Sequence, residues 1–235
     1  MNYAGEARRA ALRLILLTLA AVCGIALFGL VLGWASTLAH FLGGVILVLA
    51  CVLAVVWVLF ALFTCYFFRD PEANTPTGAG LVVCPGHGKI DAIGQIPESQ
   101  FPGGPCHRIS MFLSVIDVHV QNSPCSGRVA AVTHTAGKFI SAVGTDSALC
   151  NENVLIGLES GETKGEKIGV RLIAGVLARR IVPFVKAGEE VKRGQRISLI
   201  QFGSRCDLYL PLDYEIKVKV GDRVVGGETI MAAKS

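Results

Sequence analysis

The sequence predicts a mainly β (α+β) soluble domain preceded by a transmembrane hairpin of two helices. Three observations support this fold class: a long stretch without charge near the N-terminus, short β-like runs after Asp70, and glycine or proline between those runs. We therefore divide the 235 residues into an N-terminal segment (1–13), a helical hairpin (14–68) and a β-rich domain (69–235).

The apolar stretch is long enough to cross a membrane twice. No Lys, Arg, Asp or Glu lies between Arg13 and Arg69. One crossing needs about 20 apolar residues, so we expect spans at Leu14–Trp34 and Leu42–Phe63. The alternatives are one long buried helix and a cleaved signal peptide, whose apolar region is only about 7–15 residues long.

Basic residues predict the orientation of this hairpin. Arg8, Arg9 and Arg13 precede the first span, Arg69 follows the second, and the connecting turn has no positive charge. Because segments rich in Lys and Arg stay in the cytoplasm, we expect both ends of the hairpin on the cytoplasmic side of the cell membrane. The β-rich domain would then face the cytosol.

The β-rich domain contains a short internal repeat. The segments "VKAGEEVKRGQRISLI" (185–200) and "VKVGDRVVGGETIMA" (218–232) share valine, lysine and glycine at the same spacing, followed by an apolar run. This pattern is typical of the hairpins in lipoyl-type half-barrels. No lysine stands at the centre between the two copies, so we expect lipoyl-like hairpins without a swinging-arm carrier.

Cysteine usage and charge favour neither a disulfide framework, a metal site nor a nucleic-acid partner. The eight cysteines include no CxxC pair, and a cytosolic domain keeps its thiols reduced. The pairs Cys84/His87 and Cys106/His107 fall short of a four-ligand zinc pattern. The net charge of +4 is modest, and its clusters at 179–180 and 192–193 suit anionic lipid headgroups or plain solvation.

Three segments carry candidate chemistry. In "CPGHG" (84–88), glycines flank His87; the plainer interpretation is a turn with a surface histidine. In "FLSVIDVHVQNSP" (112–124), strand alternation places Asp117, His119 and Gln121 on one face, as in a strand lining a site or any half-exposed strand. In "IQFGSRCDLYLP" (200–211), Gly203-Ser204 interrupts an apolar strand, which indicates either a bulge or chemistry on the chain itself.

A Gly-Ser bond is chemically suited to self-cleavage. The serine hydroxyl attacks the preceding carbonyl, and glycine allows the strained backbone that this requires. A base must take the hydroxyl proton, and amide donors must hold the oxyanion. The resulting ester eliminates to dehydroalanine, which hydrolyses to an N-terminal pyruvoyl group. That ketone forms a Schiff base with an amine and acts as an electron sink.

The order and spacing of several motifs resemble the phosphatidylserine decarboxylase family, in its short prokaryotic form. These motifs are "YFFRDPE" after a membrane hairpin, "DVHV" with a proline close behind, "IAGVLARRIV" and "FGSRCDLYLP". The resemblance extends over nearly the whole chain. It implies a proenzyme that cleaves itself between Gly203 and Ser204 into a β chain (1–203) and an α chain (204–235).

The resemblance also implies the activity and two of its residues. The processed enzyme decarboxylates membrane phosphatidylserine to phosphatidylethanolamine through a Schiff base with the pyruvoyl group derived from Ser204. His119 matches the family histidine that supports processing and catalysis, and an imidazole that titrates near neutral pH suits a base or proton donor. Apolar residues 66–68 ("YFF") are expected to seat the domain on the bilayer.

This chain departs from the family pattern at two places. Pro85-Gly86-His87-Gly88 stands where the family has Pro-Ala-Asp-Gly, so His87 is a candidate replacement for the family aspartate, with Asp91 and Asp117 as alternatives. "VQNSP" stands where the family has "VNRxP", which removes an arginine. Arg108 and Arg128 are candidates to replace it in binding the substrate.

Two other functions compete with this one. An unprocessed lipid-binding relative keeps the fold without the chemistry, and a membrane-tethered structural β module has neither self-cleavage nor a reactive carbonyl. Small β domains with edge strands also often pair, so a homo-oligomer is a further expectation.

Overall fold

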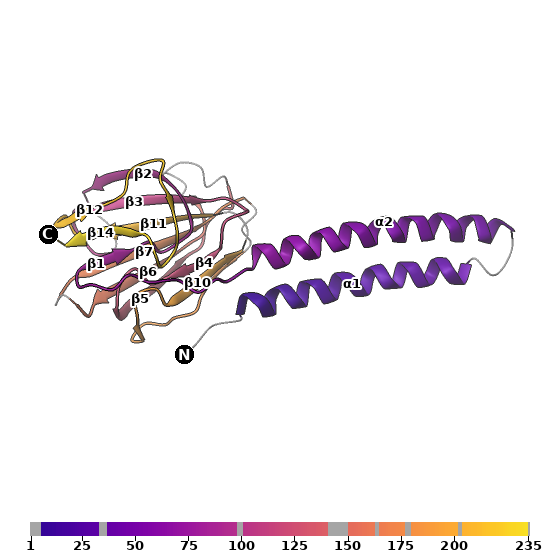
Figure 1. The fold of residues 1–235 in the computed structure, drawn as a ribbon, viewed down its shortest axis with the longest axis horizontal. Helices are drawn as coiled ribbons and strands as arrows, with labels where there is room; N and C mark the ends of the chain where they lie inside the picture. Colours follow the sequence, from indigo (N-terminus) through magenta and orange to yellow (C-terminus); the bar gives the residue numbers. More distant parts are fainter. Residues whose placement is uncertain are drawn as a thin grey trace. The chain divides into compact units, whose positions relative to one another are not determined.

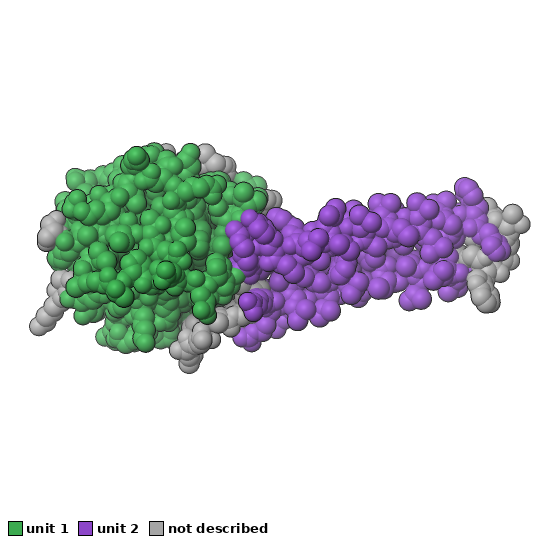
Figure 2. Space-filling model, viewed as in Figure 1, with its two compact units in different colours: residues 1–4, 70–235 green, residues 5–69 purple. Residues whose placement is uncertain are grey.

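The chain forms two compact units, residues 5–69 and residues 70–235 together with 1–4 (Figure 2). The computed structural model describes residues 6–32, 37–97, 101–140, 150–162, 165–176, 180–201 and 204–234. Within these ranges, the helices lie before residue 70 and the strands after it.

Residues 5–69 form two long helices, α1 (Glu6–Leu32) and α2 (Thr37–Phe67) (Figure 1). Both are apolar around most of their circumference, which is typical of helices in lipid. Segments of 24 residues (Arg8–Val31) and 28 residues (His40–Phe67) are long and apolar enough to cross a membrane. The prediction of two apolar helices is therefore confirmed. α1 begins before the predicted first span and ends at Leu32, and α2 extends beyond the predicted second span at both ends. Trp34 lies outside the described residues.

Small and polar residues join α1 to α2. Trp57 Nε1 donates a hydrogen bond of 2.6 Å to Thr18 Oγ1, which satisfies an indole N–H inside an apolar hairpin. A Cβ on Gly29 would lie 2.6 Å from Ile46 Cγ2, so glycine permits the close approach of the helices.

The second unit consists of antiparallel β-sheets, as the sequence predicts. Eight strands form a curled sheet in the order β13-β2-β3-β11-β7-β6-β5-β9, and two three-stranded sheets have the orders β1-β14-β12 and β4-β10-β8 (Figure 1). The strands are β1 (Leu81–Val83), β2 (Gly88–Ile96), β3 (Cys106–Leu113), β4 (Val120–Asn122), β5 (Gly127–Thr135), β6 (Asn153–Ser160), β7 (Lys167–Ala174), β8 (Arg180–Pro183), β9 (Glu190–Val191), β10 (Arg196–Gln201), β11 (Ser204–Leu210), β12 (Tyr214–Ile216), β13 (Arg223–Val224) and β14 (Ile230–Lys234).

Alternation along the central strands defines the core. Every second residue of β3, β11, β7 and β6 is fully buried in one hydrophobic cluster; examples are Met111, Leu208, Leu172 and Ile156. The intervening residues of β11 (Arg205, Asp207 and Tyr209) lie on the opposite face. The sheet therefore has an apolar inner face and a second face that also carries buried charge.

The internal repeat folds into two equivalent turns at the two edges of the large sheet. Gly188 and Gly194 flank β9, Gly221 and Gly227 flank β13, and all four glycines have positive φ. Because β9 and β13 are the outermost strands, the two copies do not pair with each other. The likeness to lipoyl hairpins stays a prediction.

Two local expectations are wrong. Residues 112–124 do not form one strand, because Ser114 and Asp117 close a turn: the backbone N–H and hydroxyl of Ser114 both donate to Asp117 Oδ2. Phe67 and Phe68 are buried and only Tyr66 is exposed, so "YFF" offers no continuous apolar surface.

Candidate functional site

Ser204 begins the central strand of the large sheet. It pairs with Leu113 at the end of β3 and with Ala174 at the end of β7. Its side chain is fully buried, and its Oγ has no hydrogen-bond partner among the described residues. A buried hydroxyl without a partner is costly to the fold, so this position calls for an explanation beyond packing. Gly203, the other half of the predicted cleavage site, lies outside the described residues.

The strands on either side of residues 202–203 belong to different sheets. β10 ends at Gln201 in a three-stranded sheet, and β11 begins at Ser204 in the eight-stranded sheet. The segment from β3 to β4 changes sheets at the same place, since β3 pairs with β11 and β4 pairs with β10. Two connections between the sheets therefore meet beside Ser204.

His119 lies in the second of these connections. Its backbone C=O accepts hydrogen bonds from Ile200 N at 3.0 Å and from Gln121 Nε2 at 2.7 Å, which fixes it against β10. Its Nδ1 lies 2.8 Å from the Asp117 carbonyl oxygen. Because a carbonyl only accepts, Nδ1 must carry the proton, and in a neutral ring Nε2 is then the basic nitrogen. The structure thus brings His119 and Ser204 to the same junction.

His87 lies in the turn that packs on the end of β3. A Cβ on Gly88 would lie 2.3 Å from the Phe112 carbonyl oxygen, and one on Gly86 would contact Leu113 and Cys206. These two glycines therefore let the turn lie against the strand end that pairs with Ser204. The His87 ring itself lies against Gly226, where a Cβ would be 3.0 Å from Nε2.

Asn122 approaches Gly226 as closely as His87 does. A Cβ at Gly226 would lie 2.9 Å from Asn122 Oδ1 and 2.9 Å from His87 Cδ2. Asn122 is fixed by a bond from its N–H to the Pro85 carbonyl and by one from Nδ2 to the Gly194 carbonyl, both 2.8 Å long. The two departures from the family pattern, at His87 and Asn122, are thus neighbours in space.

Three of the other candidates lie elsewhere in the sheet, and the carboxylate of the fourth, Asp117, is already bound. Asp91 binds Arg205, which lies on the opposite face of the sheet from Ser204. In the backbone register of the sheet, Arg108 stands opposite Tyr209 and so lies on that same opposite face. The exposed Arg128 stands opposite Glu159 and Glu190, near the edge of the sheet. The carboxylate of Asp117 is held by Ser114 and by Arg223, 3.3 Å away.

Sequence reasoning missed a buried ion cluster next to Ser204. The guanidinium of Arg205 is fully buried and binds Asp91 through two contacts, Nη1 to Oδ2 at 2.7 Å and Nη2 to Oδ1 at 2.8 Å, while Nε lies 3.3 Å from Asp207. Burial raises the pKa of the Asp207 carboxyl. The two charged residues in the otherwise apolar segment "SRCDLYL" could have indicated this buried ion pair.

The cysteines near the site are unreactive by environment. Cys84 donates to the Gly86 carbonyl and contacts Met111, away from His87, and burial raises the pKa of its thiol to about 12. Among the residues that the structure describes, no group of three His, Cys, Asp or Glu side chains is placed to bind a metal.

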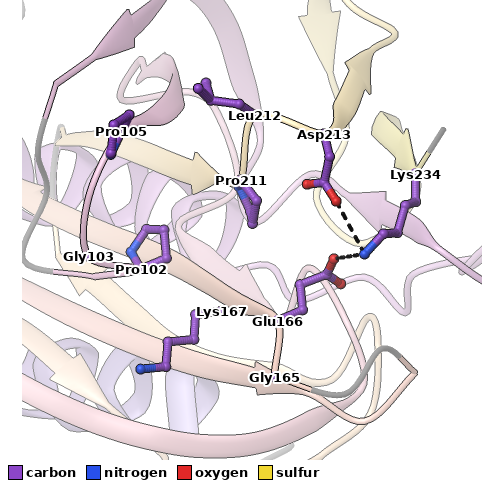
Figure 3. A pocket seen from close by; sticks show the side chains of 10 residues that line it. All are labelled: Pro102, Gly103, Pro105, Gly165, Glu166, Lys167, Pro211, Leu212, Asp213 and Lys234. Atoms are coloured by element: carbon purple, nitrogen blue, oxygen red, sulfur yellow. Dashed lines mark hydrogen bonds and ion pairs between the residues drawn. The ribbon is translucent and has the colours of Figure 1, made fainter.

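A pocket of about 500 Å³ lies at the far end of β11 from Ser204 (Figure 3). Lys234 crosses it, with Nζ 2.6 Å from Glu166 and 3.4 Å from Asp213. The hydrogen bond to Glu166 raises the pKa of Lys234, and Tyr214 donates to the other Glu166 oxygen at 2.6 Å. Lys234 and Glu166 therefore bind each other within the fold. The pocket lies at the opposite end of β11 from Ser204.

Comparison with known proteins identifies the family. The family model described as phosphatidylserine decarboxylase matches residues 60–232. The chain belongs to the phosphatidylserine decarboxylase family. A phosphatidylserine decarboxylase proenzyme of Desulfotalea psychrophila is 41% identical over 180 residues, covering 77% of this chain and 83% of the relative. One of Symbiobacterium thermophilum is 40% identical over 197 residues, covering 81% and 91%.

Membership of the phosphatidylserine decarboxylase family makes this chain a decarboxylase enzyme. A third proenzyme of that name, from Pelobacter propionicus, is 41% identical over 173 residues. The name "proenzyme" fits a chain that becomes active by processing. Ser204 and His119 both lie next to the connections between the eight-stranded sheet and the sheet of β4, β10 and β8.

Proposed function

We propose that this chain cleaves itself between Gly203 and Ser204 and then, as a pyruvoyl enzyme, converts phosphatidylserine to phosphatidylethanolamine at the cytoplasmic face of the membrane. The observation that carries the proposal is the buried Ser204 hydroxyl, without a hydrogen-bond partner in the described chain, at the junction that also holds His119. The Ser110 hydroxyl, on the opposite face of the sheet, is equally buried and also has no hydrogen-bond partner among the described residues, so the junction with the His119 segment is what distinguishes Ser204.

The surroundings of Ser204 fit a pyruvoyl group at the start of the α chain. Backbone pairing to β3 and β7 on both sides holds the residue in place. A ketone at this position has no O–H group that must find an acceptor, unlike the hydroxyl that it replaces. The pyruvoyl carbonyl supplies an electrophile for the substrate amine and an electron sink as carbon dioxide leaves.

His119 is the residue that we assign to proton transfer. Its Nδ1–H bond to the Asp117 carbonyl fixes the ring and leaves Nε2 able to accept a proton. Nε2 takes the Ser204 hydroxyl proton during self-cleavage and later returns a proton to the product carbon. The buried position of His119 keeps bulk water from competing for that proton.

His87 is the residue that we assign to the role of the family aspartate. It lies in the turn that contacts the end of β3, and its ring approaches Asn122 at Gly226. A neutral imidazole is itself a base, with a reference pKa near 6.5. In this role the neutral His87 ring accepts a proton, as an ionised aspartate would.

Intact-mass measurement of the purified membrane protein tests the proposal. We expect fragments 1–203 and 204–235, with the smaller one blocked by a group that reacts with hydroxylamine and with borohydride. Ser204→Ala should stay intact and lose all decarboxylase activity. Ser110→Ala is the matched control, because Ser110 is equally buried on the opposite face of the same sheet.

Two results would overturn the proposal. An active but uncleaved Ser204→Ala protein would separate the chemistry from this serine. A wild-type chain that stays intact, without a reactive carbonyl, would instead favour an unprocessed lipid-binding relative or a tethered structural module.

A further inference from the structure

The exposed apolar side chains of the β-rich unit gather at the end of the sheet where Ser204 lies. That end is defined by the pairing of Ser204 with Leu113 and Ala174, on β3 and β7, the neighbours of β11 (Figure 1). Within the described part of this unit, eight large apolar residues are exposed. Five of them lie in three loops near this end: Val115, Ile116, Phe139, Ile140 and Val176.

Hydrogen bonds and chain connectivity place these loops together. Val115 and Ile116 come two and three residues after Leu113, and Val176 comes two residues after Ala174. The loop that contains Phe139 and Ile140 is joined to the end of β7 by Asn151. Its Nδ2 donates to the Ile140 carbonyl at 2.8 Å and to the Ala174 carbonyl at 2.7 Å. The apolar surface is therefore built from segments far apart in the sequence.

Basic residues accompany the apolar ones. Arg180 is exposed and pairs with Gln201, the last residue of β10 before the crossing to Ser204. Lys138 is exposed and precedes Phe139 in the same loop. Apolar side chains beside cations are the combination that binds the interface of a membrane with anionic lipids.

The anchor keeps this unit close to a bilayer. α2, which is long enough to span a membrane, ends at Phe67, and β1 begins at Leu81. Even fully extended, the connection of residues 68–80 reaches only about 45 Å. A membrane is therefore the surface that these loops meet at high effective concentration.

We propose that the three loops, which we call the apolar rim, insert into the lipid interface, with Lys138 and Arg180 against the headgroups. The rim lies at the end of the sheet that bears Ser204, which is the end that a phospholipid headgroup would approach while its acyl chains stay in the bilayer. The choice of phosphatidylserine as that lipid rests on the proposed function, whereas the insertion itself does not.

Tryptophan quenching in the full-length protein tests the insertion. The chain has two tryptophans, Trp34 and Trp57; both are changed to phenylalanine so that a single probe remains. The probe is placed by Val176→Trp in one protein and Ile116→Trp in a second. Leu212→Trp is the matched control, since Leu212 is 45% exposed, against 59% for Val176, and follows the far end of β11. Vesicles contain phosphatidylglycerol with brominated acyl chains.

We expect brominated lipid to quench both rim probes and to leave the Leu212 probe unquenched. Two independent rim positions guard against a single variant that fails to fold. Equal quenching at all three sites, or none at the rim, would overturn the inference. Blue-shifted but unquenched rim emission would also overturn it, because a second protein chain would then cover the rim. Decarboxylation is not needed for the readout, so a failed proposed function and a failed insertion give different results.

Discussion

His87 and Asn122 occupy the two positions at which we expect this chain to differ from the family motifs, and the fold makes them neighbours. A Cβ on Gly226 would lie 2.9 Å from Asn122 Oδ1 and 2.9 Å from His87 Cδ2, so glycine leaves the space that both side chains occupy. A carboxamide is uncharged, and an imidazole is uncharged when it carries one proton. We therefore propose that the two side chains act together as a polar pair and not as an ion pair.

Gly226→Ala tests whether the position of His87 matters for self-cleavage. The added methyl group would lie 3.0 Å from His87 Nε2 and 2.9 Å from Asn122 Oδ1, so the imidazole must shift. Because small misplacements of catalytic groups are costly, we expect cleavage to slow by roughly ten- to a hundred-fold. The measurement is the rate at which fragment 204–235 appears during cell-free synthesis.

Gly94→Ala is the control for this change. A Cβ at Gly94, in β2, meets nothing within 4 Å, so its cleavage rate should equal that of the parent. Normal cleavage of both variants would show that the His87 ring has no role in processing.

At the scale of strands, alternation is readable from the sequence, whereas turns closed by side-chain hydrogen bonds are not. Met111 and Leu208 stand at alternate apolar positions, and their strands form as expected. The turn at Ser114 and Asp117 was missed because "SVID" continues an apolar run, while the turn is closed by a backbone hydrogen bond from Asp117 N to the Ser114 carbonyl and by two bonds from Ser114 to the Asp117 carboxylate. Ser204 and His119 were found by their motifs, but their common junction depends on two sheets and needed the fold.

Asp91→Asn tests the ion pair that joins β2 to β11 across β3. The change removes the negative charge that binds the buried Arg205 guanidinium through two carboxylate oxygens. Breaking a fully buried pair costs about 3–5 kcal/mol, and Asp91 is about one-third exposed, so we expect a loss of about 2 kcal/mol in the free energy of unfolding. Chemical denaturation of the purified protein in detergent measures this loss.

Glu215→Gln provides the comparison, because the pair of Glu215 with Lys217 is exposed on both sides and should contribute little. Self-cleavage should proceed in Asp91→Asn, since this carboxylate lies on the face opposite Ser204. A variant as stable as its parent would contradict the structural role, and an uncleaved one would return Asp91 to the candidates for the base.

At the scale of the whole chain, the orientation of the anchor decides which pool of lipid the enzyme meets. Arginines lie in the first turns of α1, at positions 8, 9 and 13, and after α2, at position 69, whereas residues 33–36 between the helices include no Lys or Arg. A short loop without positive charge is the part that crosses to the outside. The β-rich unit, which comes after α2 in the chain, should therefore lie in the cytoplasm together with the N-terminus.

Protease protection measures this orientation directly. In inverted inner-membrane vesicles, added protease should digest the β-rich unit and leave a protected fragment of about two helices, whereas intact spheroplasts should protect the unit completely. A variant places two lysines at the start of α2, by Ser36→Lys and Thr37→Lys, and removes the three N-terminal arginines. Part of its population should show the opposite pattern of protection, since orientation follows the balance of Lys and Arg. Digestion of the wild-type unit in spheroplasts would place the site on the outer face, and phosphatidylserine made in the cytoplasm would then have to cross the membrane before this enzyme could use it.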